Sequence, residues 1–90
     1  MAKILLVEDD ADLNEMIRTV LENQGFDVLA VGSGEAALEA LDQHHVDLMI
    51  SDVMMPGMDG FSLLSEIRQA NMTTPVLFIT VKGSYEDKNR

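Results

Sequence analysis

The hydrophobic and polar positions of the chain follow two alternating patterns. Short runs rich in apolar residues are typical of strands buried in a parallel sheet, and they occur at residues 4–7, 26–31, 47–51 and 76–79. After the first run, apolar residues recur every three or four positions, which is the pattern of an amphipathic helix. These positions are Leu13, Met16, Ile17, Val20 and Leu21. The pattern therefore predicts strands and helices in alternation, beginning with a strand.

Helix boundaries can be predicted from single residues. Asp10 and Ser33 are placed to cap the first and second helices, and Gly25 is placed to end the first one. Helices are expected at residues 11–24, 35–43 and 61–70. The third has Phe61, Leu64 and Ile67 along its apolar face, with Leu63 near the same face. Such alternation favours a doubly wound α/β fold with a parallel sheet and right-handed crossovers. The strand at 26–31 is the less uniformly apolar one, which suggests a sheet edge.

Composition narrows the possible functions. The chain has 90 residues, a length that suits a single domain. It has no Cys, and its net charge is −10. Disulfides and thiolate metal sites are thus excluded, and direct nucleic-acid binding by this segment is not expected. No apolar stretch is long enough to cross a membrane and the first residues do not resemble a signal peptide, so we expect a cytoplasmic protein. The acidic balance suits a cation or a basic partner, and is also common among soluble proteins.

Acidic residues follow two of the expected strands. Glu8 and Asp9 come directly after the first strand, Asp52 ends the third, and Thr80 follows the fourth. The carboxyl ends of parallel strands share one edge of the sheet, so these side chains are expected to converge there. Close carboxylates repel one another unless a cation lies between them, and Mg²⁺ suits a site with few carboxylates. This arrangement indicates phosphoryl transfer with a carboxylate oxygen as nucleophile.

The adjacent His44 and His45 are a weaker metal candidate. On a helix, neighbouring side chains point about 100° apart, so the pair does not easily share one ion. We interpret them as cations near the end of the second helix.

Four segments carry a family resemblance, namely KILLVEDD, the helix after it, DLMISDVMMPGMDG and PVLFIT. In order and spacing they resemble the receiver domain of bacterial two-component response regulators. The resemblance implies a flavodoxin-like doubly wound sheet with strand order 2-1-3-4-5. It also implies that Asp52 accepts a phosphoryl group from a histidine kinase and that Thr80 is the switch hydroxyl. The implied Mg²⁺ ligands are Glu8, Asp9, Asp52 and the backbone carbonyl of Met54, and the implied loop-shaping residues are Pro56 and Gly60.

The chain departs from the family pattern after its fourth strand. Receivers carry a lysine at the end of a fifth strand, and no fifth strand follows here. Neither Lys82 nor Lys88 is assigned that role. Residues 1–90 are thus expected to form a truncated receiver domain with strand order 2-1-3-4. Val81 also replaces the small residue that usually follows the switch hydroxyl, which could hinder access to Asp52.

Three functions remain open at this point. The first is a signalling switch, not an enzyme, in which Asp52 is phosphorylated with Mg²⁺ bound. The second is a receiver-derived fragment without phosphotransfer, which forms a homo-oligomer through the edge of its fourth strand or by domain swapping. The third is a phosphatase with an aspartyl nucleophile. The haloacid-dehalogenase type needs a second Asp where this chain has Met54, so this alternative ranks lowest.

Overall fold

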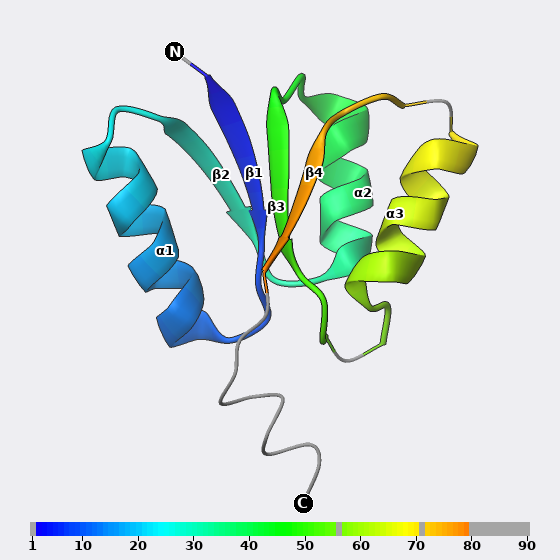
Figure 1. The fold of residues 1–90 in the computed structure, drawn as a ribbon, viewed down its shortest axis with the longest axis horizontal. Helices are drawn as coiled ribbons and strands as arrows, with labels where there is room; N and C mark the ends of the chain where they lie inside the picture. The colour runs from blue at the N-terminus through cyan, green and yellow to red at the C-terminus, as the bar shows by residue number, and fades with distance from the viewer. Residues whose placement is uncertain (1, 56, 71, 80–90) are drawn as a thin grey trace, which may run out of the picture.

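A computed structural model describes residues 2–55, 57–70 and 72–79 of the chain. Strands and helices alternate along these residues, as the apolar pattern predicts (Figure 1). The elements are β1 (Lys3–Val7), α1 (Ala11–Asn23), β2 (Asp27–Val31), α2 (Gly34–Gln43), β3 (Leu48–Asp52), α3 (Gly60–Gln69) and β4 (Val76–Ile79). The predicted boundaries are correct to within about one residue.

The four strands form one parallel sheet in the order β2-β1-β3-β4. The doubly wound architecture and the position of β2 at an edge are thus confirmed. Val7, at the end of β1, is in register with Val31 of β2 and with Ser51 of β3. All four strands therefore end at the same side of the sheet, which is the lower edge in Figure 1. Any side chain that directly follows a strand is delivered to that edge.

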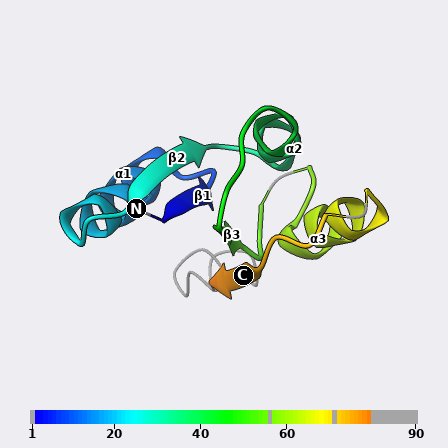
Figure 2. The ribbon, with the colours of Figure 1, turned by 90° about the horizontal axis from the view of Figure 1, so that it is seen from above.

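Helices cover both faces of the sheet, but unequally (Figures 1 and 2). Beneath α2 and α3 lies a large hydrophobic cluster. It consists of Leu5, Val7, Ala37, Ala40, Val46, Met49, Met55, Leu63 and Ile67, all buried. The α1 face has a smaller cluster, whose buried members are Ile4, Leu6 and Ile50. Alternate residues of β1 thus supply both clusters, because successive side chains of a strand point to opposite faces.

The prediction for α1 is correct in type but wrong in the width of its buried stripe. Ile17 and Leu21 pack against the smaller cluster, whereas Met16 and Val20 are 57% and 55% exposed. No residue of α1 is fully buried. Among the described helices, α1 alone covers this face, and it contacts the sheet along a narrow line beside which Met16 and Val20 lie.

The apolar face expected for α3 is confirmed at Leu63 and Ile67 and is wrong at Phe61. Leu63 and Ile67, four positions apart, are fully buried, whereas Phe61 is 60% exposed. Two residues apart on a helix means about 200° apart, so Phe61 and Leu63 cannot share a face. The Phe61 ring instead packs near Phe78 of β4, with 5.1 Å between the two ring centroids.

The predicted helix ends are confirmed by their hydrogen bonds. The Asp10 carboxylate accepts from the backbone N–H of Leu13, and the Ser33 hydroxyl accepts from that of Ala36. These bonds satisfy N–H groups that the first turn of a helix leaves unpaired. Gly25 follows α1 with a φ of 96°, a left-handed conformation that favours glycine.

Candidate functional site

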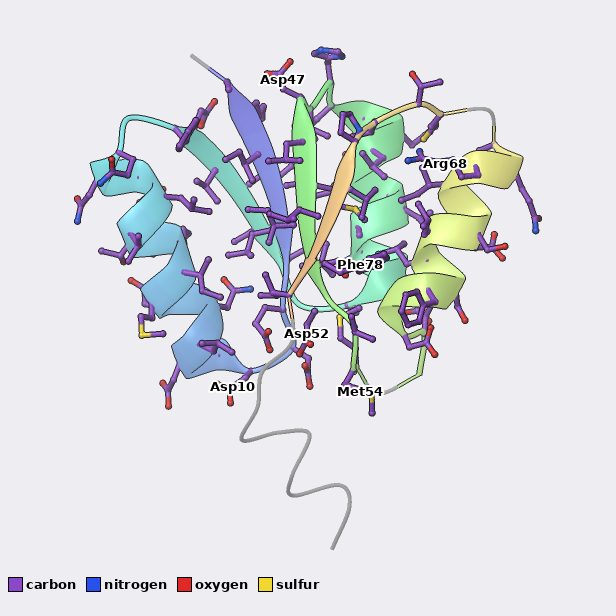
Figure 3. All side chains as sticks on the ribbon, in the orientation of Figure 1. Asp10, Asp47, Asp52, Met54, Arg68 and Phe78 are labelled. Carbon is purple, nitrogen blue, oxygen red and sulfur yellow. The ribbon has the colours of Figure 1, made fainter. Side chains whose placement is uncertain are left out.

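The acids that follow β1 and β3 come together at the carboxyl edge of the sheet. Glu8, Asp9 and Asp52 each offer a carboxylate oxygen, and these oxygens lie within 4.8 Å of one another. The parallel register of β1 and β3 produces this arrangement, since it brings the two strand ends side by side. Figure 3 shows Asp52 at this edge, near Asp10 and Met54, with Asp47 at the opposite end of β3. The convergence predicted for these three acids is confirmed.

Glu8 is the most constrained of the three. Its side chain is 2% exposed, and its Oε2 atom accepts a hydrogen bond of 2.9 Å from the backbone N–H of Asp10. The pKa of Glu8 is raised to about 7, chiefly by burial and with smaller contributions from the neighbouring charges of Asp52 and Asp9, while the hydrogen bond from Asp10 acts in the opposite direction. In the metal-free protein this carboxyl is therefore partly protonated near neutral pH.

The other oxygen of Glu8 bears on which ion the site would suit. Within the described residues, Oε1 is buried and has no hydrogen-bond partner. A buried carboxylate oxygen without a partner is unfavourable, because it has lost its water and gained nothing in exchange. Oxygen donors from several acids, one of them unsatisfied, fit a hard divalent cation such as Mg²⁺. The residues present thus suit the ion that the sequence predicts.

Asp52 is buried at the end of β3 and is 1% exposed. Its Oδ1 atom accepts a hydrogen bond of 3.1 Å from the backbone N–H of Met54. The turn that follows Asp52 therefore folds back onto the carboxylate and fixes its orientation. A buried, oriented carboxylate beside a cation site can act as a nucleophile or as a metal ligand.

The loop between β3 and α3 is anchored close to Asp52. Gly60 donates from its backbone N–H to the carbonyl of Val53 at 3.0 Å. A Cβ atom at position 60 would lie 2.8 Å from the backbone oxygen of Asp52 and 2.9 Å from a ring carbon of Phe78. Only glycine permits this approach, which supports the loop-shaping role expected for Gly60. Pro56 and Thr80 lie outside the described residues.

One polar contact near the acids was missed by the sequence analysis. The Asn14 side chain, on α1, donates to the backbone carbonyls of Glu8 and Val31, both at 3.0 Å. Asn14 also lines a pocket of about 290 Å³ beside Glu8 and Asp9. The available signal was a polar residue next to Leu13, near the inward stripe of α1, where an apolar side chain is usual.

Residues 4–90 match the family model described as the response regulator receiver domain. The chain belongs to this family. Receiver domains are signalling domains of two-component systems, and those of response regulators interact with histidine kinases.

Among relatives, the transcriptional regulatory protein CpxR of Klebsiella pneumoniae is 46% identical over 88 residues, which is 98% of this chain and 37% of that protein. CpxR of Escherichia coli K12 is 43% identical over the same length and share. The chain thus spans little more than a third of the length of the curated relatives it matches.

Solved receiver structures have the same fold. The receiver domain of the Francisella response regulator 1452 superposes with a TM-score of 0.85 at 34% identity, over 89% of this chain and 66% of that one. The response regulator TrrA of Thermotoga maritima, in complex with Mg(2+)-BeF, gives a TM-score of 0.83 at 30% identity, over 89% of this chain and 70% of that one.

In the described residues no helix is long and apolar enough to span a bilayer.

Proposed function

We propose that this receiver domain accepts a phosphoryl group on Asp52 from a histidine kinase in a Mg²⁺-dependent reaction. The observation that carries the proposal is the convergence of Glu8, Asp9 and Asp52 within 4.8 Å, together with the unsatisfied Oε1 atom of Glu8. The proposed Mg²⁺ ligands are these three carboxylates and the backbone carbonyl of Met54. When bound, Mg²⁺ would neutralise charge between the acids and the incoming phosphoryl group.

The proposed transfer uses Asp52 as the nucleophile. A carboxylate oxygen of Asp52 forms a bond to phosphorus, and the bond between phosphorus and the imidazole nitrogen of the kinase histidine breaks. The electron pair of that bond returns to the imidazole nitrogen. The hydrogen bond from Met54 to Oδ1 holds the carboxylate in place, and burial keeps water away from it. Thr80 is the hydroxyl expected to contact the phosphoryl group afterwards.

The direct test is the intact mass of the protein after incubation with Mg²⁺ and acetyl phosphate. The parent chain should gain the mass of one phosphoryl group, and Asp52→Asn should gain none, since an amide is not a comparable nucleophile. Asp42→Asn is the matched control, because Asp42 is an exposed residue of α2 and lies outside the acid cluster. Omission of Mg²⁺ should also prevent the gain. Modification of Asp52→Asn to the same extent as the parent would refute Asp52 as the acceptor.

A second candidate function is self-association through β4. Among the described strands, β4 pairs only with β3, and Leu77 in its middle is 53% exposed. An apolar strand with a free hydrogen-bonding edge can pair with a second chain. Sedimentation of the parent should then show dimers that Leu77→Lys converts to monomers, whereas Asp52→Asn should leave them intact. A monomeric parent at high concentration would rule out this candidate and leave phosphorylation of Asp52 unaffected.

A further inference from the structure

Asn14 lies in a helix that belongs to the family pattern, but the resemblance implies no role for this residue. It lies one residue after Leu13 in α1, and its backbone N–H donates to the carbonyl of Asp10 at 2.8 Å. Its side chain is half-buried and points toward the ends of β1 and β2 rather than into solvent. Asn14 is therefore placed where α1 meets the carboxyl edge of the sheet.

Both amide hydrogens of Asn14 are used. One bond goes to the carbonyl of Glu8 and the other to the carbonyl of Val31, each at 3.0 Å. A carbonyl can only accept, so both partners require the nitrogen of the amide and neither can be served by its oxygen. Among the side chains of the right length, only an amide or a cation offers two such donors.

Both backbone groups of Glu8, its N–H and its carbonyl, take part in this hydrogen-bond network. The N–H of Glu8 donates to the carbonyl of Val31 at 3.1 Å, and that same carbonyl accepts from Asn14. The carbonyl of Glu8 accepts the second Asn14 bond. Glu8 comes one residue after the end of β1, and its N–H still pairs with the end of β2. The Asn14 side chain binds the carbonyl of Glu8, so that both backbone groups of this residue are held.

We infer that Asn14 is a positioning residue for the acid site: it holds Glu8, and through Glu8 the geometry of the three carboxylates. This inference rests on the proposed Mg²⁺ site. Polar groups that orient metal ligands without touching the metal typically change its affinity by about 10-fold or more when removed. Among the described residues of α1, Asn14 is the one whose side chain donates a hydrogen bond to the backbone of Glu8.

The test compares two substitutions of the same kind on the same helix. Asn14→Leu keeps the size of the side chain and removes both donors, whereas Asn23→Leu changes an exposed residue at the far end of α1. Mg²⁺ affinity is measured by calorimetric titration with MgCl₂, under conditions where every variant is folded. Asn14→Leu should weaken Mg²⁺ binding about 10-fold, and Asn23→Leu less than about two-fold. Asp9→Ala, which removes a proposed ligand, gives the scale of a complete loss.

A second readout does not depend on the metal. The backbone N–H of Glu8 donates to the Val31 carbonyl, which also accepts from Asn14. In Asn14→Leu, the hydrogen-exchange rate of the Glu8 amide should therefore rise relative to the exchange rate of the Leu6 amide, in the middle of β1. A purely structural role would not have this local signature. Ile67→Val, which loosens the core beneath α3, controls for stability and should leave both Mg²⁺ affinity and this exchange ratio unchanged.

The outcomes separate the inference from the proposed function. Equal Mg²⁺ affinity for Asn14→Leu and the parent would overturn the positioning role and leave the metal site in place. If the parent itself binds no Mg²⁺, the metal site is wrong and the inference falls with it. If Asn14→Leu does not fold, Asn14→Ser, which keeps one donor on a shorter side chain, should still bind Mg²⁺ more weakly than the parent, and unchanged affinity would overturn the inference.

Discussion

The two faces of the sheet are packed in different ways. On one face, α2 and α3 bury small and large apolar side chains against β1 and β3, and Leu63 and Ile67 are fully buried. On the other face, α1 contributes only partly buried residues such as Ile17 and Leu21. The first face has the larger set of fully buried apolar side chains and is therefore expected to contribute more of the hydrophobic stabilisation.

The α1 face has fewer buried apolar side chains, but it supplies hydrogen bonds to Glu8. The residue that caps α1, Asp10, donates its N–H to Glu8, and Asn14 binds the carbonyl of Glu8. Within the described residues, neither α2 nor α3 makes a hydrogen bond to Glu8, Asp9 or Asp52. The larger core cluster thus depends on α2 and α3, whereas the hydrogen bonds to Glu8 come from α1 and its N-cap.

Truncation of one side chain on each face should expose this difference in stability. Leu63→Ala leaves a cavity in the larger cluster and should lower the free energy of unfolding by roughly 2–5 kcal/mol. Ile17→Ala, on α1, should cost roughly 1–2 kcal/mol because the side chain is only partly buried. The measurement is urea unfolding followed by circular dichroism.

Met16→Ala is the control for the exposed side of α1. Met16 is 57% exposed, so the change in unfolding free energy should stay within about 0.5 kcal/mol. A loss for Ile17→Ala as large as that for Leu63→Ala would show that the two faces stabilise the fold equally and would remove the contrast.

Without a bound metal, ionisation of the buried Glu8 should lower the stability that the packing of both faces provides. The pKa of Glu8 is raised from 4.5 to about 7 by burial, which means that the folded state favours the protonated acid. Stability in the presence of a chelator should therefore fall as pH rises from about 4.5 to about 7, and level off above that. The expected loss is on the order of 1–3 kcal/mol. Thermal unfolding across this range measures it, and added Mg²⁺ should reduce it.

Glu8→Gln is the matched variant for this pH dependence. The amide has the shape of the protonated acid and cannot ionise, so the fall between pH 4.5 and 7 should disappear. Asp47 and Asp59 have pKa values lowered below 3.8, chiefly by backbone hydrogen bonds from Lys3 and Ser62, and their contribution is lost only as pH falls below that value. The same pH profile for Glu8→Gln and the parent would mean that Glu8 is not the group responsible.

The fold was largely predictable because strand and helix periods depend on residues close in sequence. The two errors, at Met16 with Val20 and at Phe61, share one cause. The helix period shows which residues share a face, but the width and centre of the buried stripe depend on what packs against the helix. That depends on the sheet, which brings distant residues together.

The acid cluster was predictable for a related reason. Glu8, Asp9 and Asp52 directly follow strands, so parallel topology alone brings them to one edge. Asn14 could not be found in this way, because its partners are backbone carbonyls, and a carbonyl has no signature in the sequence. The unsatisfied Oε1 atom of Glu8 likewise depends on the rotamer and on burial, which only the folded structure shows.

The hydrogen bond from Met54 to Asp52 also has a consequence for symmetry. The two oxygens of an isolated carboxylate are equivalent, and a half-turn about the Cβ–Cγ bond exchanges them. In this protein one oxygen position receives the Met54 N–H at 3.1 Å, so the two positions differ in charge and in access. A reagent arriving at Asp52 therefore meets a carboxylate with two distinct sides, and the main chain of the next turn determines which side is which.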